Sequence, residues 1–315
     1  MLKRMYKKNI IISSIILLLI TILSIIPNNK NNNIEQRVSY VNYELNTQEV
    51  YLLDNNNYLN RVKIGTHNTK EELVNELIEI LTCSSNSSDK IPDGFKCILN
   101  SNTKINSISI KDDLIKIDFN KYLLDTSKEL EEKTIESIVY TLTNIDNINK
   151  IIILIDGNML TKLPQNNITL PSTLSREFGI NKKYKLTSTK NINKTTIYYI
   201  NKLNNKNYYT PITLINNDTR EKIEIIIDEL SNRFISNNFN SYLNNNTKVL
   251  NSYIKDNTMH INFNENILSG LNNNDIIEEV IYTISLSIND NYDIKNVFFD
   301  VNSKEIAKTA IKSLE

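Results

Sequence analysis

The chain of 315 residues is poor in the residue types on which small reactive sites depend, with two His, two Cys, five Gly and no Trp. This scarcity leaves little room for metal clusters, glycine-rich nucleotide loops or histidine-based catalysis. The chain also lacks an excess of one charge, with 36 Lys and Arg against 36 Asp and Glu. Nucleic-acid binding needs a basic excess or a basic block to neutralise phosphates. We therefore expect no cofactor, no metal and no nucleic-acid partner.

Asparagine is abundant instead, with 53 residues, whereas alanine occurs only at Ala307 and Ala310. Together with many Lys and Ile residues, this composition is typical of AT-rich codon usage and says little about function. An apolar share of 40% is sufficient for hydrophobic cores. The length favours two domains.

One long apolar run lies near the N-terminus, where residues 10–26 contain no charge. As a helix this run is about 26 Å long, close to the hydrocarbon core of a bilayer. We predict a cytoplasmic basic tail at 1–9, a transmembrane anchor at 10–27 and an Asn-rich spacer at 28–48. A secretory signal peptide is the alternative, but no small-residue cleavage site follows the run. No Cys lies near its end, so processing as a lipoprotein is not expected.

The basic residues all precede the apolar run in this N-terminal segment, and the remaining chain holds 32 bases against 36 acids. The positive-inside rule keeps the basic end in the cytoplasm. We therefore expect a single-pass protein of the cell membrane with an extracytoplasmic body. In that compartment Cys83 and Cys97 could form a disulfide, or they could be two independent buried thiols.

The body of the chain is an internal repeat, with copies at residues 49–158 and 195–302. Each copy has a tyrosine-bearing strand, a second strand, a helix, two further strands, a second helix and a closing apolar strand. The second helices carry similar segments, Ile138–Leu142 and Val280–Ile284, in which a Tyr-Thr pair lies at the same place. Regular apolar spacing supports the helices, and alternation supports the strands. A duplication is the simplest explanation.

This order of elements predicts an α/β (α+β) fold with two tandem copies of a small sheet, each with two helices packed on one face. The segment 159–194 is too apolar for a flexible linker, and we expect it to pack between the copies. Residues 303–315 are predicted to form a C-terminal helix.

Short motifs of the first copy resemble the GerMN domain of the GerM family of sporulation and spore germination proteins. The matching segments are Tyr51–Asp54, Ile91–Gly94, Ile117–Phe119, Val139–Leu142 and Ile155–Gly157. The Arg-Glu-Phe-Gly-Ile-Asn segment ending at Asn181 is similar to the inter-repeat stretch of that family. The second copy is diverged, since it lacks the Pro-Asp-Gly turn.

The resemblance implies a ring-building-motif-like fold and a non-enzymatic, membrane-attached, extracytoplasmic role in endospore-forming bacteria. Family members are associated with septum formation and with the assembly between mother cell and forespore. Many carry a lipid anchor on Cys, whereas this chain is predicted to use a helix. GerMN modules also occur in envelope lipoproteins that act beside sensor kinases.

The sequence provides no catalytic, cofactor-binding or metal-binding residues. His67 is interpreted as a surface loop residue, and His260 as an outward residue of a strand. Three Ser-x-x-Lys matches lack the other motifs of penicillin-binding enzymes. Adjacent carboxylates are interpreted as a turn or as solvated helix faces; they are Asp112-Asp113, Glu131-Glu132 and Glu278-Glu279. Tyr140 and Tyr282 are interpreted as helix residues that pack on the sheet.

We therefore predict an assembly module that contacts envelope or septal membrane proteins and that could also self-associate. The alternative is a sensory or ligand-binding module that regulates a membrane partner such as a sensor kinase. A deep polar pocket between the copies favours the alternative, and an open apolar patch favours assembly. A cell-wall hydrolase is a third class, for which the sequence offers no candidate residues.

Overall fold

The computed structural model describes residues 46–66, 70–82, 88–232, 239–268, 275–294 and 296–310. The predicted tail 1–9 and anchor 10–27 lie outside these residues, and so do His67 and Cys83. The last residues of the predicted spacer, 46–48, belong to the first strand. Within the described residues no helix is both long and apolar enough to cross a membrane.

The described residues of the first copy form two α-helices and six strands. They are β1 (Asn46–Leu53), β2 (Leu59–Thr66), α2 (Lys70–Thr82), β3 (Ile105–Lys111), β4 (Leu114–Phe119), α3 (Lys128–Leu142), β5 (Lys150–Ile155) and β6 (Asn158–Met159), with short 3-10 turns η1 (Ser88–Lys90) and η2 (Lys121–Leu124). Strands β3 to β6 form a four-stranded sheet in sequence order. Strands β4 and β5 are parallel, as their connection through α3 requires.

The second copy repeats this plan after a connecting segment with η3 (Arg176–Phe178) and β7 (Lys183–Lys185). Its elements are β8 (Asn193–Leu203), β9 (Lys206–Asn216), α4 (Lys222–Ser231), β10 (Val249–Lys255), β11 (Thr258–Phe263), η4 (Glu265–Ile267), α5 (Glu278–Tyr292), β12 (Asn296–Val301) and β13 (Lys304–Ala310). The second four-stranded sheet has the order β10-β11-β12-β13. The predicted α/β architecture, with two helices packed on a small sheet in each copy, is confirmed.

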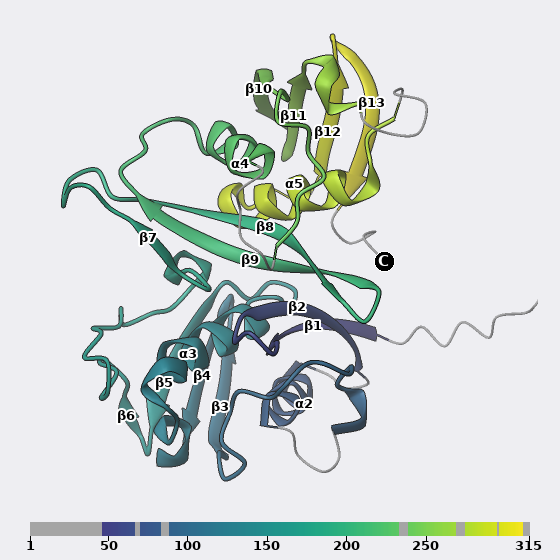
Figure 1. Cartoon of the computed structure of the whole chain (residues 1–315). Coiled ribbons are helices and arrows are strands. Elements are labelled where there is room, and N and C mark those ends of the chain that lie inside the picture. The colour runs from purple at the N-terminus through teal and green to yellow at the C-terminus, as the bar shows by residue number, and fades with distance from the viewer. Residues whose placement is uncertain are drawn as a thin grey trace, which may run out of the picture. The chain divides into compact units, whose positions relative to one another are not determined.

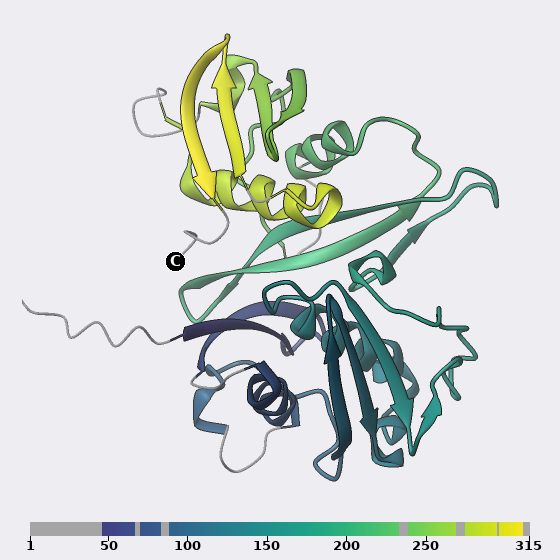
Figure 2. The same cartoon turned by 180° about the vertical axis from the view of Figure 1, so that it is seen from behind.

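The opening hairpins of the two copies leave their own sheets and join one another (Figure 1). Arg61 of β2 pairs with Tyr209 of β9, so that β1, β2, β9, β8 and β7 form one five-stranded sheet. In Figures 1 and 2 the helices α4 and α5 lie between β8–β9 and the sheet of β10–β13. The first copy has the corresponding arrangement, with α2 and α3 packed against β1.

The residues of β1 explain this position. Val50, Tyr51 and Leu52 are fully buried, and Leu53 is almost so, which means that both faces of the strand are covered. A continuous apolar run, rather than an alternating one, is the pattern of such a strand.

Equivalent residues of the two copies meet one another across the shared sheet. Each copy inserts a tyrosine edge-on against a phenylalanine of the other, with ring centroids 4.8 Å apart for Tyr58–Phe239 and 4.7 Å apart for Tyr208–Phe95. Leu53 forms an isolated antiparallel β-bridge with Lys96, and Ile200 forms one with Asn240. Leu53 and Ile200 are therefore equivalent residues of the two copies, and so are Lys96 and Asn240. An interface in which equivalent residues exchange contacts is isologous, so the copies are related by a pseudo-twofold axis.

Three further contacts obey the same relation. The hydroxyls of Tyr51 and Tyr198 are 3.1 Å apart, and Asn201 donates to Asp54 at 2.8 Å. Thr210 donates to Asn60, and these two residues occupy matching positions in β9 and β2. The duplicated unit therefore packs on its own copy as a homodimer would.

The correspondence read from the two Tyr-Thr pairs was wrong by one helical turn. Thr141 accepts a hydrogen bond from the backbone N–H of Tyr51, whereas the N–H of Tyr198 donates to Ser287, not to Thr283. Tyr198 accordingly packs against Leu286. A shift of four residues keeps the same face of a helix toward its neighbour, so apolar periodicity cannot distinguish the two alignments.

The predicted C-terminal helix at 303–315 was also wrong, because residues Lys304–Ala310 form strand β13. Asn302 and Ser303 have φ values of 50° and 65° and make a tight turn that returns the chain antiparallel to β12. Ile306 and Ala307 then pack against the second core. Pairing with a buried strand overrides the helical propensity of Ala and Lys.

The connecting segment packs into the first core. Its buried apolar side chains join the cluster of the first copy; they are Leu163, Leu170, Leu174, Phe178 and Ile180. Leu203 and Tyr208 of the second copy pack against the same cluster. Residues from both copies and from the segment thus share one hydrophobic core.

Candidate functional site

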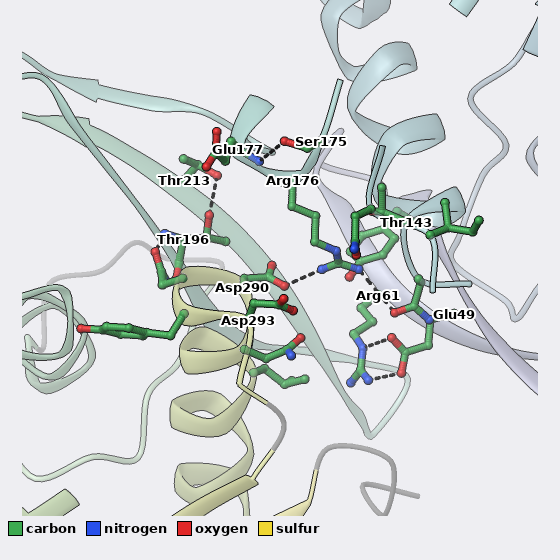
Figure 3. A pocket seen from close by; sticks show the side chains of 18 of the residues that line it. Glu49, Arg61, Thr143, Ser175, Arg176, Glu177, Thr196, Thr213, Asp290 and Asp293 are labelled. Atoms are coloured by element: carbon green, nitrogen blue, oxygen red, sulfur yellow. Dashed lines mark hydrogen bonds and ion pairs between the residues drawn. The ribbon is translucent and has the colours of Figure 1, made fainter. Parts of the chain in front are cut away.

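A buried ion pair joins the connecting segment to the second copy (Figure 3). The Arg176 guanidinium lies 2.5 Å from the carboxylate of Asp290 on α5, whose side chain is only 2% exposed. Short turn η3 presents the arginine. Ser175 accepts a hydrogen bond from Glu177 N–H at 3.3 Å at its start, and Gly179, with φ of 86°, ends it. Only a residue without a Cβ adopts that conformation easily.

Two tyrosines contact the residues of the ion pair. Tyr198 donates to the second oxygen of Asp290 at 2.8 Å, and the Tyr140 hydroxyl donates to the Arg176 carbonyl at 3.0 Å. The guanidinium also lies over the Tyr140 ring, 4.9 Å from its centroid. Such contacts use both the charge and the flat face of arginine.

The electrostatics of this cluster favour the ion pair. Burial is the largest effect and lowers the pKa of Arg176, but the Asp290 carboxylate and the neighbouring tyrosines together outweigh it, so that the arginine pKa lies well above its ordinary value. Burial raises the pKa of Tyr198 well above 10, and the negative charge of Asp290 raises it further. The Tyr198 phenol therefore remains protonated near neutral pH and donates its hydrogen bond to Asp290.

A single amide side chain links three parts of the fold. Asn181 Oδ1 accepts from the Leu59 N–H at 3.0 Å, and Nδ2 donates to the carbonyls of Leu59 and Pro211 at 2.8 and 2.9 Å. Leu59 lies in the first copy and Pro211 in the second. Asn181 has φ of 47°, a backbone conformation that asparagine tolerates better than most residues.

Buried charges hold the same segment on helix α3. Lys182, with 6% side-chain exposure, lies 2.7 Å from Glu132 and 3.5 Å from Glu136. Glu136 also accepts from the Asn181 N–H at 2.8 Å. Burial raises the pKa of Glu136, and Lys182 partly offsets this effect. These contacts fix the segment to the first copy while Arg176 and Asn181 bind it to the second.

A hollow of about 900 Å³ opens between the copies. Its walls come from segments 143–149, 175–177 and 192–194, from the end of helix α5 and its cap at 289–293, and from strands β1 and β2. Figure 3 shows two ion pairs among its charged side chains: Arg61 binds Glu49, and Arg176 binds Asp290. The charges of these four residues are therefore already compensated.

Three exposed apolar side chains lie on one strand of the second copy. Strand β10 carries Leu250, Tyr253 and Ile254, which are 55%, 50% and 54% exposed. On the face away from the helices, three rings stack across neighbouring strands. The His260 ring lies 4.7 Å from Tyr253 and 4.7 Å from Phe298, with planes inclined by 5° and 13°. We call Tyr253, His260 and Phe298 the aromatic ladder.

The structure shows where several residues singled out in the sequence lie. His260 does face outward, but as the middle ring of the aromatic ladder. Asp112, with φ of 53°, lies in the predicted hairpin turn. Glu278 is exposed and accepts from Tyr282 at 2.5 Å. Tyr140 is a buried core residue as predicted. Cys97 is disulfide-bonded, while Cys83 lies outside the described residues.

The interpretation of Glu131 as solvated was wrong, since it is 1% exposed and accepts from the N–H groups of Gln165 and Asn166 at 2.8 and 2.7 Å. Its position on a polar helix face hid this role. Asp290 and Tyr253 were missed altogether. Nothing in the local sequence marks an aspartate near a helix end as buried, and an aromatic residue in a strand is more often core. Within the described residues no group of three His, Cys, Asp or Glu could hold a metal ion.

The fold and these contacts define a tandem α/β protein whose two copies are fastened together by a packed, charged connecting segment. The Germane family model, described as sporulation and spore germination, matches residues 49–161 and 196–307. These matches span more than half of the chain, and the chain belongs to this family.

Two relatives support this assignment. The spore germination protein GerM of Bacillus subtilis (strain 168) is 28% identical over 266 residues, which cover 82% of this chain and 72% of that protein. The solved structure of the tandem GerMN domains of the sporulation protein GerM from Bacillus subtilis is similar with a TM-score of 0.75 and 25% identity. It covers 84% of this chain and 96% of that one.

Proposed function

We propose that this chain is a non-enzymatic assembly module of the sporulation or germination envelope machinery. It is anchored in the cell membrane by residues 10–27, with its N-terminus in the cytoplasm and its two copies outside. It acts by binding other envelope or septal membrane proteins. Family membership supports the process, and the uncharged run of residues 10–26 supports the anchor.

The observation that carries the assembly role is the exposed apolar edge of the second copy. Leu250, Tyr253 and Ile254 are each at least half exposed on a strand at the end of its sheet. Isolated exposed apolar residues are common, but several on one sheet edge form a template for another chain. The tightly fastened copies would present this edge in a fixed position.

A deletion strain tests the proposal through its heat-resistant spore count, with imaging of septa and engulfment. We expect a sharp loss of spores and cells stalled after asymmetric division. Restoration by the full chain, but not by a form with residues 1–27 replaced by a cleavable leader, would support the anchor. Normal spore counts in the deletion strain would contradict the proposed process.

A second candidate is a ligand-binding regulator, which the hollow between the copies favours. Its volume of about 900 Å³ lies within the range of small-molecule sites. Binding there must compete with the Arg61–Glu49 and Arg176–Asp290 pairs. Envelope extracts fractionated by size would then raise the melting temperature of the wild-type protein but not of Lys194→Glu, which alters the rim of the hollow. No shift with any fraction would count against this candidate.

A further inference from the structure

The interface between the two copies is closed on itself. Equivalent residues meet across the pseudo-twofold axis, and a twofold contact uses up the surface that forms it. Any further association of the module must therefore use another surface. Among the described strands, β10 lies at an end of the second sheet and pairs only with β11.

The hairpin register shows which backbone groups of β10 face outward. Lys255 and Thr258 flank a two-residue turn, so they form a hydrogen-bonded pair. Hydrogen-bonded and non-hydrogen-bonded pairs alternate along an antiparallel ladder. Tyr253 therefore bonds to His260, whereas Ser252 and Ile254 direct their N–H and C=O groups away from β11. These two residues can accept another strand.

We propose that β10 pairs antiparallel with β10 of another molecule of this protein, here called the partner molecule, about a twofold axis at Tyr253. This inference rests on the assembly function proposed above. In this register Ser252 of one molecule exchanges both backbone hydrogen bonds with Ile254 of the partner molecule. Ser252 and Ile254 are the two residues whose backbone groups point away from β11. Tyr253 then lies directly opposite Tyr253 of the partner molecule, with Cα atoms about 4.5 Å apart.

The aromatic ladder makes this register favourable. Directly opposite residues of paired strands lie on the same face of the sheet, so the two Tyr253 rings become neighbours. Each already stacks on His260, and His260 on Phe298. The ladder continues through the axis as six rings on one face of an eight-stranded sheet. The exposed face of Tyr253 is covered by the same kind of contact that covers its other side.

The charges of the edge are compatible with this pairing. Lys255 lies opposite Asn251 of the partner molecule. The two Lys255 residues are therefore separated by four strand positions, or about 13 Å. In each molecule the start of β10, near Lys248, lies beside the β10–β11 turn of the partner molecule, which carries Asp256. No like charges oppose one another, and opposite charges become diagonal neighbours.

The first copy provides an internal comparison. Strand β3 has the same irregularity near its start and the same position in its sheet. Ser109 pairs with Lys116 in β3 as Tyr253 pairs with His260 in β10. In the first sheet, Ser109 and Lys116 thus occupy the positions at which the second sheet has the stacked rings of Tyr253 and His260. The contrast assigns self-association to the diverged second copy.

Cysteine substitution tests the register directly. The compact unit of residues 46–315 contains both cores and is suitable for this purpose. Disulfides require Cα atoms within about 7 Å. Under mild oxidation we expect a mixture of the Asn251→Cys and Lys255→Cys variants, which keep Tyr253, to form a covalent heterodimer, and each variant alone to remain a monomer. No crosslinking in the mixture, or equal crosslinking of either variant alone, would overturn the proposal.

Sedimentation equilibrium gives an independent measurement. Tyr253→Ser, which copies the residue of the first edge, should weaken dimerisation at least tenfold, whereas Tyr184→Ser at another exposed tyrosine should not. A wild-type protein that stays monomeric at all concentrations overturns the inference. If in-cell crosslinking from position 253 then captures a different envelope protein, the assembly function stands. If it captures none, that function fails too.

Discussion

The hydroxyl groups of Tyr51 and Tyr198 lie 3.1 Å apart, although the two residues are separated by 147 positions in the chain. They occupy the same place in the two copies, and both are buried beside the Arg176–Asp290 ion pair. This contact joins equivalent residues of the two copies, and it lies beside the ion pair made by Arg176 of the connecting segment. We therefore expect the polar groups at this point to contribute to the stability of the module.

Replacing Arg176 should destabilise the protein strongly. In Arg176→Leu the Asp290 carboxylate loses its counter-ion while it remains buried, which costs about 3 to 5 kcal/mol. Urea unfolding measures the change in the free energy of unfolding. The control is Arg220→Leu, which breaks exposed pairs with Asp218 and Asp228 and should cost less than about 1 kcal/mol. Similar losses for both variants would refute the importance of the buried pair.

Asn181 should be more important than its size indicates. Asn181→Ala removes three hydrogen bonds to backbone groups of both copies, at about 1 kcal/mol each. It also places alanine in a left-handed conformation. Asn191→Ala isolates that second effect, because Asn191 is exposed and has φ of 52°. We expect the first variant to lose about 3 kcal/mol more, with faster hydrogen exchange of the Leu59 amide; equal losses would contradict this role.

Gly94 in the Pro-Asp-Gly turn is predicted to be required for docking as well as for the turn itself. A Cβ at this position would lie 2.5 Å from Leu203 Cδ2 in the hairpin of the second copy, and φ is 96°. At Gly157 φ is 80°, but no atom lies within 4 Å of an added Cβ. Both substitutions to alanine should cost about 1 kcal/mol from the backbone. Gly94→Ala should cost more in chemical unfolding, and an equal cost would show that Leu203 simply moves aside.

The buried tyrosines should make the fold sensitive to alkaline pH. Burial raises the pKa of Tyr51, Tyr140 and Tyr198 above the ordinary value of 10.0. The unfolded chain loses these protons from about pH 10, while the folded chain retains them. Their contribution is therefore complete below pH 10 and is lost as the pH rises from 10 through the raised values.

Chemical unfolding between pH 9 and 11.5 measures this loss. The stability of Tyr198→Phe should fall less steeply with pH than that of the wild type, because one phenol no longer titrates on unfolding. Tyr122→Phe, at an exposed position, should keep the wild-type slope. An unchanged slope for Tyr198→Phe would mean that its phenol ionises equally in both states.

The periodicity of the sequence predicted the repeat, the α/β class and the order of most elements, because apolar spacing reflects which face of an element is buried. Its errors were local. The Tyr-Thr pairs of the two helices aligned one turn away from their structural equivalents, and Ala307 lies in a strand where a helix was predicted. In both cases a contact with another element decided between two arrangements that the local pattern allowed.

The candidate site was much less accessible to such reasoning. Motif resemblance drew attention to the segment ending at Asn181, but not to the function of its side chains. Asp290 and Arg176 are 114 positions apart, and each lies in an ordinary polar context. The edge residue Tyr253 has the same local pattern as a core strand residue.

The sequence by itself determined the two copies, most of their helices and strands, and the balance of positive and negative charge, since these follow from composition and from local burial. The tertiary structure decided that the opening hairpins of both copies would merge into one sheet and that equivalent residues would face each other there. It also decided which charges are buried together and which strand edge remains exposed. These features depend on contacts between residues far apart in the chain, whose free energies no local pattern records.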